Sequence, residues 1–342
     1  MPARATEENR EPIVRVISLN LQKDGGQDTA DGAIPQRWLD AHEGILAPRR
    51  PDIVLRQEAT YSHLDNKRRL RAAGDILGMK GILTPNGSGR NPTAMFLRPE
   101  TFPSTETLYD SDAQRAWWRT PPTVVKTQFA DVPDVDWVLV SWHAAFNSPR
   151  GRERETEELT TFVDKVKGGT AFLGGGDCNE YPLEPGEKVP HIDWTSPEIT
   201  DPVHVRHRTN AGPDGSRVSC TYLDDTLLGC GLHDAARYAA RVNTDALNPT
   251  AGHAPGAAGQ GGPRRIDRIY LDPWIIQAVL DVNVLDTTGV SDHHGVEVIL
   301  SRRKLTEALR RSFPPLAVWT PAGYGSHHGH HRDIRSEGTV PA

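Results

Sequence analysis

Short apolar runs rich in β-branched residues recur along the chain, a pattern that is typical of buried β-strands. Each run meets, at one end, a side chain that can bind a metal ion, carry a proton or hold a phosphate. We expect six such strands, at residues 13–19, 52–55, 137–142, 170–173, 266–271 and 296–300. Because charged groups are rarely buried without partners, six polar strand ends predict that these groups meet in one site.

Whether a polar group precedes or follows its strand in the sequence predicts the direction of that strand. Four groups follow their strands and two precede them: Asn20, Gln57 with Glu58, His143, and Asp177 with Asn179; then Asp267, and Asp292 with His293. All six can lie at one edge only if the last two strands run antiparallel to the others. Helical periodicity at residues 37–47, 64–77 and 152–167 places helices on the outer faces. The sequence therefore predicts a layered α/β sandwich with mixed sheets.

Composition indicates one domain with tails. The 342 residues are 37% hydrophobic, which allows a substantial core. We expect a disordered tail at 1–11, a catalytic domain at 12–301, and an extension at 302–342 that begins with an amphipathic piece at 304–311 and ends in a His-rich, disordered tract. The opening segment lacks an apolar stretch and no run is long enough to span a membrane, so we expect a cytoplasmic protein with reduced cysteines.

The chemistry of the polar groups favours a magnesium enzyme. Carboxylate and amide oxygens are the ligands that Mg²⁺ prefers, usually together with a substrate phosphate. The three cysteines are not spaced for a structural zinc site. Metal-assisted hydrolysis of a phosphate ester, with a protein base presenting water, fits these residues.

Taken in order, the motifs resemble those of the endonuclease/exonuclease/phosphatase superfamily. They are Leu19-Asn20, Gln57-Glu58, the His143 segment, Gly176-Asp177-Cys178-Asn179, Arg265-Ile266-Asp267 and Ser291-Asp292-His293. The resemblance covers about residues 12–301. It implies a deoxyribonuclease-like, four-layer α/β sandwich of two mixed β-sheets flanked by helices.

The resemblance also implies a role for each residue. Glu58 would be the principal Mg²⁺ ligand, supported by Asn20 and Asp292, and Mn²⁺ would be able to substitute. Asp177 would orient or deprotonate the attacking water. The remaining roles concern the phosphate: Asn179 would hold an oxygen or help to position water, His293 would contact the phosphoryl group with Asp267 behind it, and His143 would be a second imidazole there.

Three departures from the family pattern change what is expected. Cys178 replaces the usual Phe, and His294-Gly295 replace Tyr-Pro. Residues 89–99 resemble the deoxyribonuclease stretch that supplies a glutamate to orient the first histidine, but they contain no carboxylate there. His143 itself disfavours the apurinic-site endonucleases, which generally have a tyrosine in that segment.

Five residues are candidates for substrate binding. They are Arg56, Arg90, Asn91, Trp118 and Arg119. Arg56 is either a phosphate contact or an outward-facing strand residue. The segment that includes Arg115, Trp117, Trp118 and Arg119 combines cations with stacking groups, although a solvated turn with core-packed indoles is favoured. Arg150, Arg152 and Arg154 are expected to form surface pairs with the glutamates at 153, 155, 157 and 158.

The long Gly- and Pro-rich stretch at 204–263 is expected to set substrate choice. Within it, a structural role is favoured for Asp234. Asp224 and Asp225 are expected to form a solvated acidic turn in preference to a second metal site.

These features predict a Mg²⁺-dependent phosphodiesterase that acts on nucleic acid or a nucleotide. The alternatives are a phosphomonoesterase of the inositol phosphatase or sphingomyelinase type, acting on a small or lipid-linked phosphate, and a catalytically silent binding module. The net charge of −6 gives no global basic field for nucleic acid. A local basic rim would suffice for a nuclease. No protein partner is predicted.

Overall fold

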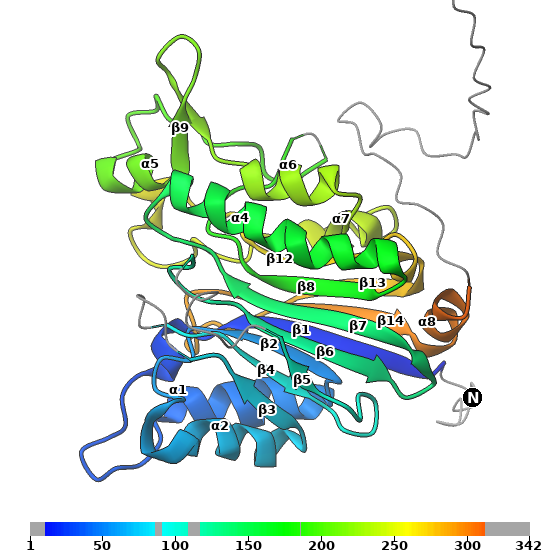
Figure 1. Cartoon of the computed structure of the whole chain (residues 1–342). Helices are drawn as coiled ribbons and strands as arrows, with labels where there is room; N and C mark the ends of the chain where they lie inside the picture. Colours follow the sequence, from blue (N-terminus) through cyan, green and yellow to red (C-terminus); the bar gives the residue numbers. More distant parts are fainter. Residues whose placement is uncertain (1–10, 86–90, 109–116, 185, 312–342) are drawn as a thin grey trace, which may run out of the picture.

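Two six-stranded β-sheets form the centre of the molecule (Figure 1). The computed structural model describes residues 11–85, 91–108, 117–184 and 186–311. The first sheet has the order β13 (Val279–Leu285), β14 (Gly295–Ser301), β1 (Ile13–Asn20), β2 (Ile53–Gln57), β4 (Ala94–Leu97) and β3 (Lys80–Leu83). The second has the order β11 (His233–Asp234), β12 (Asp267–Leu271), β8 (Ala171–Asp177), β7 (Val132–His143), β6 (Thr123–Phe129) and β5 (Glu106–Thr107).

Both sheets are mixed, as the sequence predicted. β1 and β2 pair in parallel, as do β7 and β8. β14 runs antiparallel to β1, and β12 runs antiparallel to β8. The polar groups that precede β12 and β14 therefore lie at the same edge as those that follow β1, β2, β7 and β8.

The strands carry continuous apolar runs because both of their faces are buried. In β1, Val14 and Val16 join a core shared by the two sheets, whereas Ile17 joins a second core with the helices on the outer face. In β7, Leu139 lies in the shared core and Val140 in a third core on the far side of the second sheet. The alternation produces three apolar layers separated by two sheets.

Helices cover the outer face of each sheet, which completes the predicted four layers (Figure 1). The first sheet is covered by α1 (Gln36–Leu39), a π-helical turn at Asp40–Leu46, a 3₁₀ turn at Ala47–Arg49 and α2 (Leu64–Leu77). The second is covered by α4 (Pro149–Val163), a 3₁₀ turn at Asp164–Gly168 and α6 (Tyr222–Gly229). The three predicted helices are present. α4 begins earlier than expected because Ser148 caps it, accepting a hydrogen bond from the Gly151 amide at 3.0 Å.

The long stretch after β8 contains short ordered elements. It includes α5 (Pro202–Arg208), the two-stranded sheet of β9 (Thr209–Ala211) and β10 (Arg217–Ser219), α7 (Ala235–Ala239), and 3₁₀ turns at Thr244–Leu247 and Ala257–Gln260. One further 3₁₀ segment at Gln22–Gly25 follows β1, and another at Ile275–Ala278 precedes β13. Among the helices that the structure describes, none is long and apolar enough to cross a lipid bilayer.

The last described helix, α8 (Arg302–Leu309), belongs to the main core. Leu305 and Leu309 are buried in the apolar layer between the sheets. Arg302 pairs with Asp131 at 2.7 Å. The compact unit thus continues past residue 301, where the sequence placed the start of an extension, because the amphipathic periodicity of 304–311 is that of a packed helix. The His-rich tract lies outside the described residues.

Candidate active site

The predicted polar groups come together at one edge of the sheets. Within the second sheet, Asp177 is the register partner of both His143 on β7 and Asp267 on β12. The glycines at 174–176 allow the strands to approach this closely. At Gly176, where φ is +152°, a Cβ would collide with the carbonyl oxygen of Trp142. The glycine run that precedes Asp177 is therefore a packing requirement of the strand that carries it.

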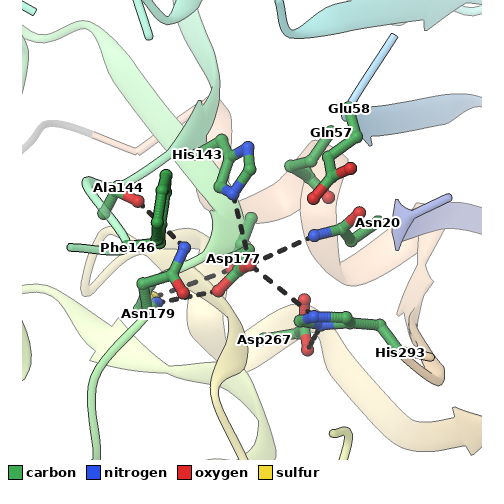
Figure 2. A network of polar contacts seen from close by, with 12 residues as sticks. Asn20, Gln57, Glu58, His143, Ala144, Phe146, Asp177, Asn179, Asp267 and His293 are labelled. Carbon is green, nitrogen blue, oxygen red and sulfur yellow. Dashed lines mark hydrogen bonds and ion pairs between the residues drawn. The ribbon is translucent and has the colours of Figure 1, made fainter. Parts of the chain in front are cut away.

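Asp177 is the centre of the site (Figure 2). One of its carboxylate oxygens, Oδ2, accepts a hydrogen bond from Asn20 Nδ2 at 3.1 Å. The same oxygen lies 3.4 Å from His143 Nε2 and 3.8 Å from His293 Nε2. The other oxygen accepts the backbone N–H of Asn179 at 2.8 Å. Burial alone would raise the pKa of Asp177, but His293 and His143 outweigh it and lower that pKa.

His293 and Asp267 form a hydrogen-bonded pair. His293 Nδ1 lies 2.8 Å from Asp267 Oδ2, which leaves Nε2 directed toward Asp177 (Figure 2). The start of β12 is fixed by Thr250, whose hydroxyl accepts the backbone N–H groups of Ile266 and Asp267 at 3.0 Å each. Burial would lower the pKa of His293, but Asp267 and Asp177 raise it to about 10. The ring is therefore protonated at neutral pH in the absence of metal.

Asn179 is held by its neighbours in an unusual backbone conformation. Its φ is +51°, in the left-handed region, which asparagine tolerates better than most residues. Its side-chain amide donates to the Ala144 carbonyl at 2.9 Å, and its Oδ1 accepts from Arg208 Nη2 at 2.7 Å. Arg208 is a site residue that the sequence analysis missed. It lies within the long 204–263 stretch, where no local pattern distinguishes it from other arginines.

His143, unlike His293, has no carboxylate bonded to its Nδ1 among the described residues. Its Nδ1 is buried, and no hydrogen-bond partner for it exists among the described residues, which exclude 86–90. Residues 91–99 contain no carboxylate, as the sequence indicated. The loop that follows His143 is instead held from α4: Glu155 accepts the backbone N–H groups of Ala145 at 2.7 Å and of Arg119 at 3.0 Å. The backbone around His143 is thus fixed from a different element.

The three predicted metal ligands are Asn20, Glu58 and Asp292. Asn20 and Gln57 are register partners at the parallel ends of β1 and β2, so Glu58 leaves the first sheet beside Asn20 (Figure 2). Glu58 has a φ of +55°, a conformation rare for a glutamate and typical of a functional constraint. Its carboxylate accepts the Lys23 amide at 2.7 Å. Asp292 accepts from Gln22 Nε2 at 2.9 Å.

The donor set fits a hard divalent cation. The Asn20 Oδ1 oxygen is buried without a hydrogen-bond partner within the described part of the chain. A buried, unsatisfied amide oxygen next to a carboxylate is costly unless a cation or water completes it. A second group, formed by Asp177, Asp267 and His293, has its ligand atoms within 4.8 Å of one another. The hydrogen bond between Asp267 and His293 already uses two of those atoms.

Two of the substrate-binding candidates are buried. The Arg56 side chain is 1% exposed and forms a 2.8 Å ion pair with Asp24, so it is neither a phosphate contact nor an outward-facing strand residue. Trp118 is 3% exposed and packs in the core on the far side of the second sheet. This burial agrees with the favoured interpretation of a core-packed indole and removes Trp118 as a stacking surface.

The other substrate-binding candidates differ in exposure, and one of them, Arg90, lies outside the described residues. Asn91 is partly buried, and its Oδ1 accepts from the Thr60 hydroxyl at 2.9 Å. The Arg119 guanidinium lies 4.9 Å from the ring centroid of Phe146, which is 46% exposed, so these two form part of the rim. Trp117 is also exposed. Arg115 also lies outside the described residues.

Some of the charged residues that the sequence analysis placed on the surface are buried. Arg152 is 0% exposed and donates to the carbonyl groups of Ala145 at 2.8 Å and His207 at 2.9 Å. The predicted surface pairs are therefore wrong for Arg152 and Glu155, because neighbouring loops cover this side of α4. Asp224 is likewise buried, not in a solvated turn, and pairs with Arg237 at 2.8 Å.

Asp234 has the structural role that was favoured for it. It caps α7 by accepting the Ala236 amide at 2.9 Å, and it pairs with Arg265 at 2.7 Å. Asp225 is exposed. With Asp224 committed to Arg237, the pair offers no preformed second metal site.

Comparison with solved structures confirms the fold. An AP endonuclease from Archaeoglobus fulgidus matches with a TM-score of 0.55 at 15% identity, covering 84% of this chain and 99% of that one. A 3′-5′ exonuclease, NExo, from Neisseria meningitidis matches with a TM-score of 0.54 at 19% identity, covering 83% and 98%. An endonuclease/exonuclease/phosphatase protein from Beutenbergia cavernae matches with a TM-score of 0.52 at 17% identity, covering 85% and 72%.

No family model matches the sequence, and no curated protein matches it. At these identities the likeness concerns the fold, and it leaves chemistry to the residues of this chain. The chain has the deoxyribonuclease-like fold of the endonuclease/exonuclease/phosphatase proteins.

Proposed function

We propose that the protein is a Mg²⁺-dependent phosphodiesterase that hydrolyses nucleic acid or a nucleotide by attack of water on phosphorus. The observation that carries the proposal is the environment of Asp177, whose carboxylate lies within 3.8 Å of two imidazole nitrogens and accepts from the Asn20 amide. Such convergence of a carboxylate and two imidazoles at buried strand ends is costly for the fold. This arrangement of a carboxylate and two imidazoles suits the hydrolysis of a phosphate ester.

Each residue of the cluster has a role in the proposed reaction. Asp177, kept ionised by its lowered pKa, accepts a hydrogen bond from the attacking water and orients it. His293, kept protonated by Asp267, donates from Nε2 to a phosphate oxygen. His143 donates to the phosphate from the other side. Asn179 holds a phosphate oxygen or positions the water.

The metal is assigned to Glu58, Asn20 and Asp292. When bound there, Mg²⁺ supplies charge neutralisation to the phosphate oxygens, and Mn²⁺ is expected to substitute. The unsatisfied oxygen of Asn20 and the left-handed conformation of Glu58 support this assignment.

Nucleic acid is the favoured substrate class. The similar structures include an AP endonuclease and a 3′-5′ exonuclease, and a second NExo structure is described as a 3′ phosphatase bound to product DNA. The net charge of −6 gives no long-range attraction for a polyanion. Cationic side chains near the site, including Arg119 and Arg208, supply the local positive charge that binding requires.

The experiment incubates the full-length chain with Mg²⁺ against plasmid, single-stranded DNA, RNA and a panel of phosphomonoesters. Polymer cleavage that stops in EDTA supports the proposal. Phosphate release without polymer cleavage would replace it with a phosphomonoesterase, and inactivity across the panel would favour a binding module. The Asp177→Asn variant, purified in parallel, controls for contaminating nucleases.

A further inference from the structure

A cavity of about 320 Å³ is lined by His293 and does not include the predicted metal ligands Asn20 and Glu58. Its wall is built by α5 and by residues 251–264, which belong to the stretch that the sequence analysis associated with substrate choice. The polar groups lining it, besides one acid, are Tyr181, His204, His207, Arg208, Gln260, Arg264 and His293. The lining acid is Asp292, which Gln22 Nε2 holds at 2.9 Å. The cavity is thus strongly cationic and continuous with the reaction centre.

The two arginines of this cavity have no carboxylate partner within the described residues. Arg208 donates to three oxygens, all uncharged: the Asn179 carbonyl at 2.6 Å, Asn179 Oδ1 at 2.7 Å and the Phe146 carbonyl at 3.0 Å. Arg264 donates to the Pro263 carbonyl at 2.7 Å, and its Nε is buried with no hydrogen-bond partner in the described part of the chain. Neither guanidinium group therefore forms an ion pair with a carboxylate, although the nearby charge of Asp177 partly offsets that of Arg208.

The adjacent arginine, which does not line the cavity, is paired with carboxylates. Arg265, one residue further along the chain, pairs with Glu187 at 2.6 Å and with Asp234 at 2.7 Å. The chain therefore supplies carboxylates to the buried arginine behind the cavity and none to the arginine that lines it. Arg264 is only partly buried, but its enclosed Nε lacks a hydrogen-bond partner within the described residues, so an anionic ligand in the cavity is its natural complement.

The uncharged groups of the cavity suit the same ligand. The Tyr181 hydroxyl lies 3.4 Å from His204 Nε2. Burial, and then the positive charge of Arg208, lower the pKa of His204 to about 4, so the ring is neutral at neutral pH. Burial and Arg208 also lower the pKa of His207. A hydroxyl and neutral imidazoles that line the same cavity as two guanidinium groups add hydrogen-bonding groups to a cationic site.

We infer that this cavity binds a second phosphate group of the substrate, next to the phosphate that is hydrolysed. Guanidinium groups match phosphate oxygens in charge and in planar, bidentate geometry. The volume of about 320 Å³ is at the lower end of the range for small-ligand cavities, which begin at roughly 300 Å³, and suits one phosphorylated sugar. The inference rests on the proposed function in that the second phosphate belongs to the substrate, and it predicts a preference for chain ends that carry a terminal phosphate.

The first test measures binding without turnover. Inorganic phosphate is titrated into the protein in EDTA, with affinity measured by calorimetry. We expect Arg264→Gln to weaken binding roughly 10-fold or more, as loss of a hydrogen bond to a charged group does. Arg206→Gln is the control, since Arg206 is an exposed arginine of α5, the helix that carries Arg208, and does not line the cavity. Equal affinity in wild type and Arg264→Gln would assign all phosphate binding to the reaction centre and overturn the inference.

The second test uses turnover. Single-stranded oligonucleotides with a terminal phosphate are compared with otherwise identical ones that end in hydroxyl groups. The terminal phosphate should lower KM roughly 10-fold in the wild type and in Arg206→Gln. Arg264→Gln should lose that advantage, and Arg264→Lys should recover part of it. An unchanged advantage in Arg264→Gln, or none in the wild type, would contradict the inference. The titration needs no hydrolysis, so it tests the phosphate site even if the enzyme is inactive. An inactive enzyme would contradict the proposed function alone.

Discussion

The strand-end cluster around Asp177 and the cavity wall built by α5 and residues 251–264 meet at Asn179, but they are built differently. Asn20, His143 and Asp177 are the last residues of their strands; the register of the second sheet places His143 next to Asp177, and Asn20 reaches Asp177 from the first sheet. The cavity wall is held by side chain to carbonyl bonds such as those of Arg208. The cluster has a geometry fixed by backbone ladders, whereas the wall can vary without disturbing them.

This difference assigns separate tasks to the two regions. A cluster fixed by strand ends suits the chemical step, which requires precise positioning of the reacting groups. A wall built from loops suits the choice of substrate. Substitutions in the cluster should therefore act mainly on kcat and on metal dependence, and substitutions around the wall mainly on KM.

The largest effect is expected for Asp177→Asn. The substitution keeps the shape of the side chain but removes the charge that orients water, so kcat should fall roughly 10²- to 10⁴-fold, the usual contribution of acid–base groups. Steady-state kinetics would measure the loss, and circular dichroism would check the fold. A folded Asp177→Asn protein with a near-wild-type rate would show that another group handles the water.

Asp272 provides a matched control for Asp177. It is equally buried and directly follows β12, at the end of that strand opposite Asp267, where it accepts the amides of Phe172, Trp274 and Ile275. Asp272→Asn places an NH₂ group against one of these donors, so the free energy of unfolding should fall by roughly 1–3 kcal/mol. The turnover of the folded fraction should not change. Loss of turnover equal to that of Asp177→Asn would mean that buried charge in general, and not the strand-end site, sustains activity.

Glu58→Gln should raise the Mg²⁺ concentration needed for activity by roughly 10- to 100-fold or more, since even indirect partners of a metal contribute that much. Titrations of activity and of Mg²⁺ binding would measure the shift. Asp225→Asn, at an exposed carboxylate away from the cluster, should leave both titrations unchanged. If the two variants require the same Mg²⁺ concentration, Glu58 is not the principal ligand.

Asp267→Asn should lower the pKa of His293. The negative charge of Asp267 favours the protonated ring, so its removal should move that pKa from about 10 toward the ordinary value of 6.5. The raised pKa stabilises the folded state fully below about pH 6.5, and the stabilisation is lost as pH rises through about 10; the variant should show less of this dependence, since only Asp177 and Asp292 still raise the pKa. NMR titration of the ring in EDTA measures the shift.

Asp286→Asn is the control for the histidine pair. Asp286 Oδ1 lies 3.8 Å from Nδ1 of His294, the neighbouring imidazole, so its removal should leave the pKa of His293 unchanged. A His293 pKa that does not move in Asp267→Asn would disprove the proposed pair.

The sequence predicted the strand-end region well because its signals are local. β1 and β7 each combine an unbroken apolar run with a polar last residue, and both features follow from burial between layers. β13 was missed because the register shifts between Val279 and Asp281, so its buried positions Val279, Val282 and Leu285 do not alternate with a period of two. Irregular pairing of this kind has no simple periodicity in the sequence.

Buried charges were the main errors, because their partners are distant in the chain. Arg56 interrupts an apolar strand, and its partner Asp24 lies 32 residues away. Arg152 looks like a surface residue of an amphipathic helix, yet the carbonyls that satisfy it belong to Ala145 and His207. Arg208 joins the site for the same reason. A pattern read within one element cannot identify contacts that tertiary packing supplies.

The smallest effect is expected at the rim, for Arg119→Gln. The Arg119 guanidinium lies 4.9 Å from the ring centroid of Phe146, and that ring also lines the cavity beside His293. Loss of this partly buried cation at the rim should raise KM for single-stranded DNA roughly two- to fivefold, leave kcat unchanged and reduce the salt dependence of binding. Arg71→Gln, at an exposed arginine of α2 on the outer face of the first sheet, should change neither value. A fall in kcat for Arg119→Gln would show that the rim and the strand-end cluster act as one unit, since Glu155 holds both the Arg119 and Ala145 amides, and the separation of tasks between the two regions would then fail.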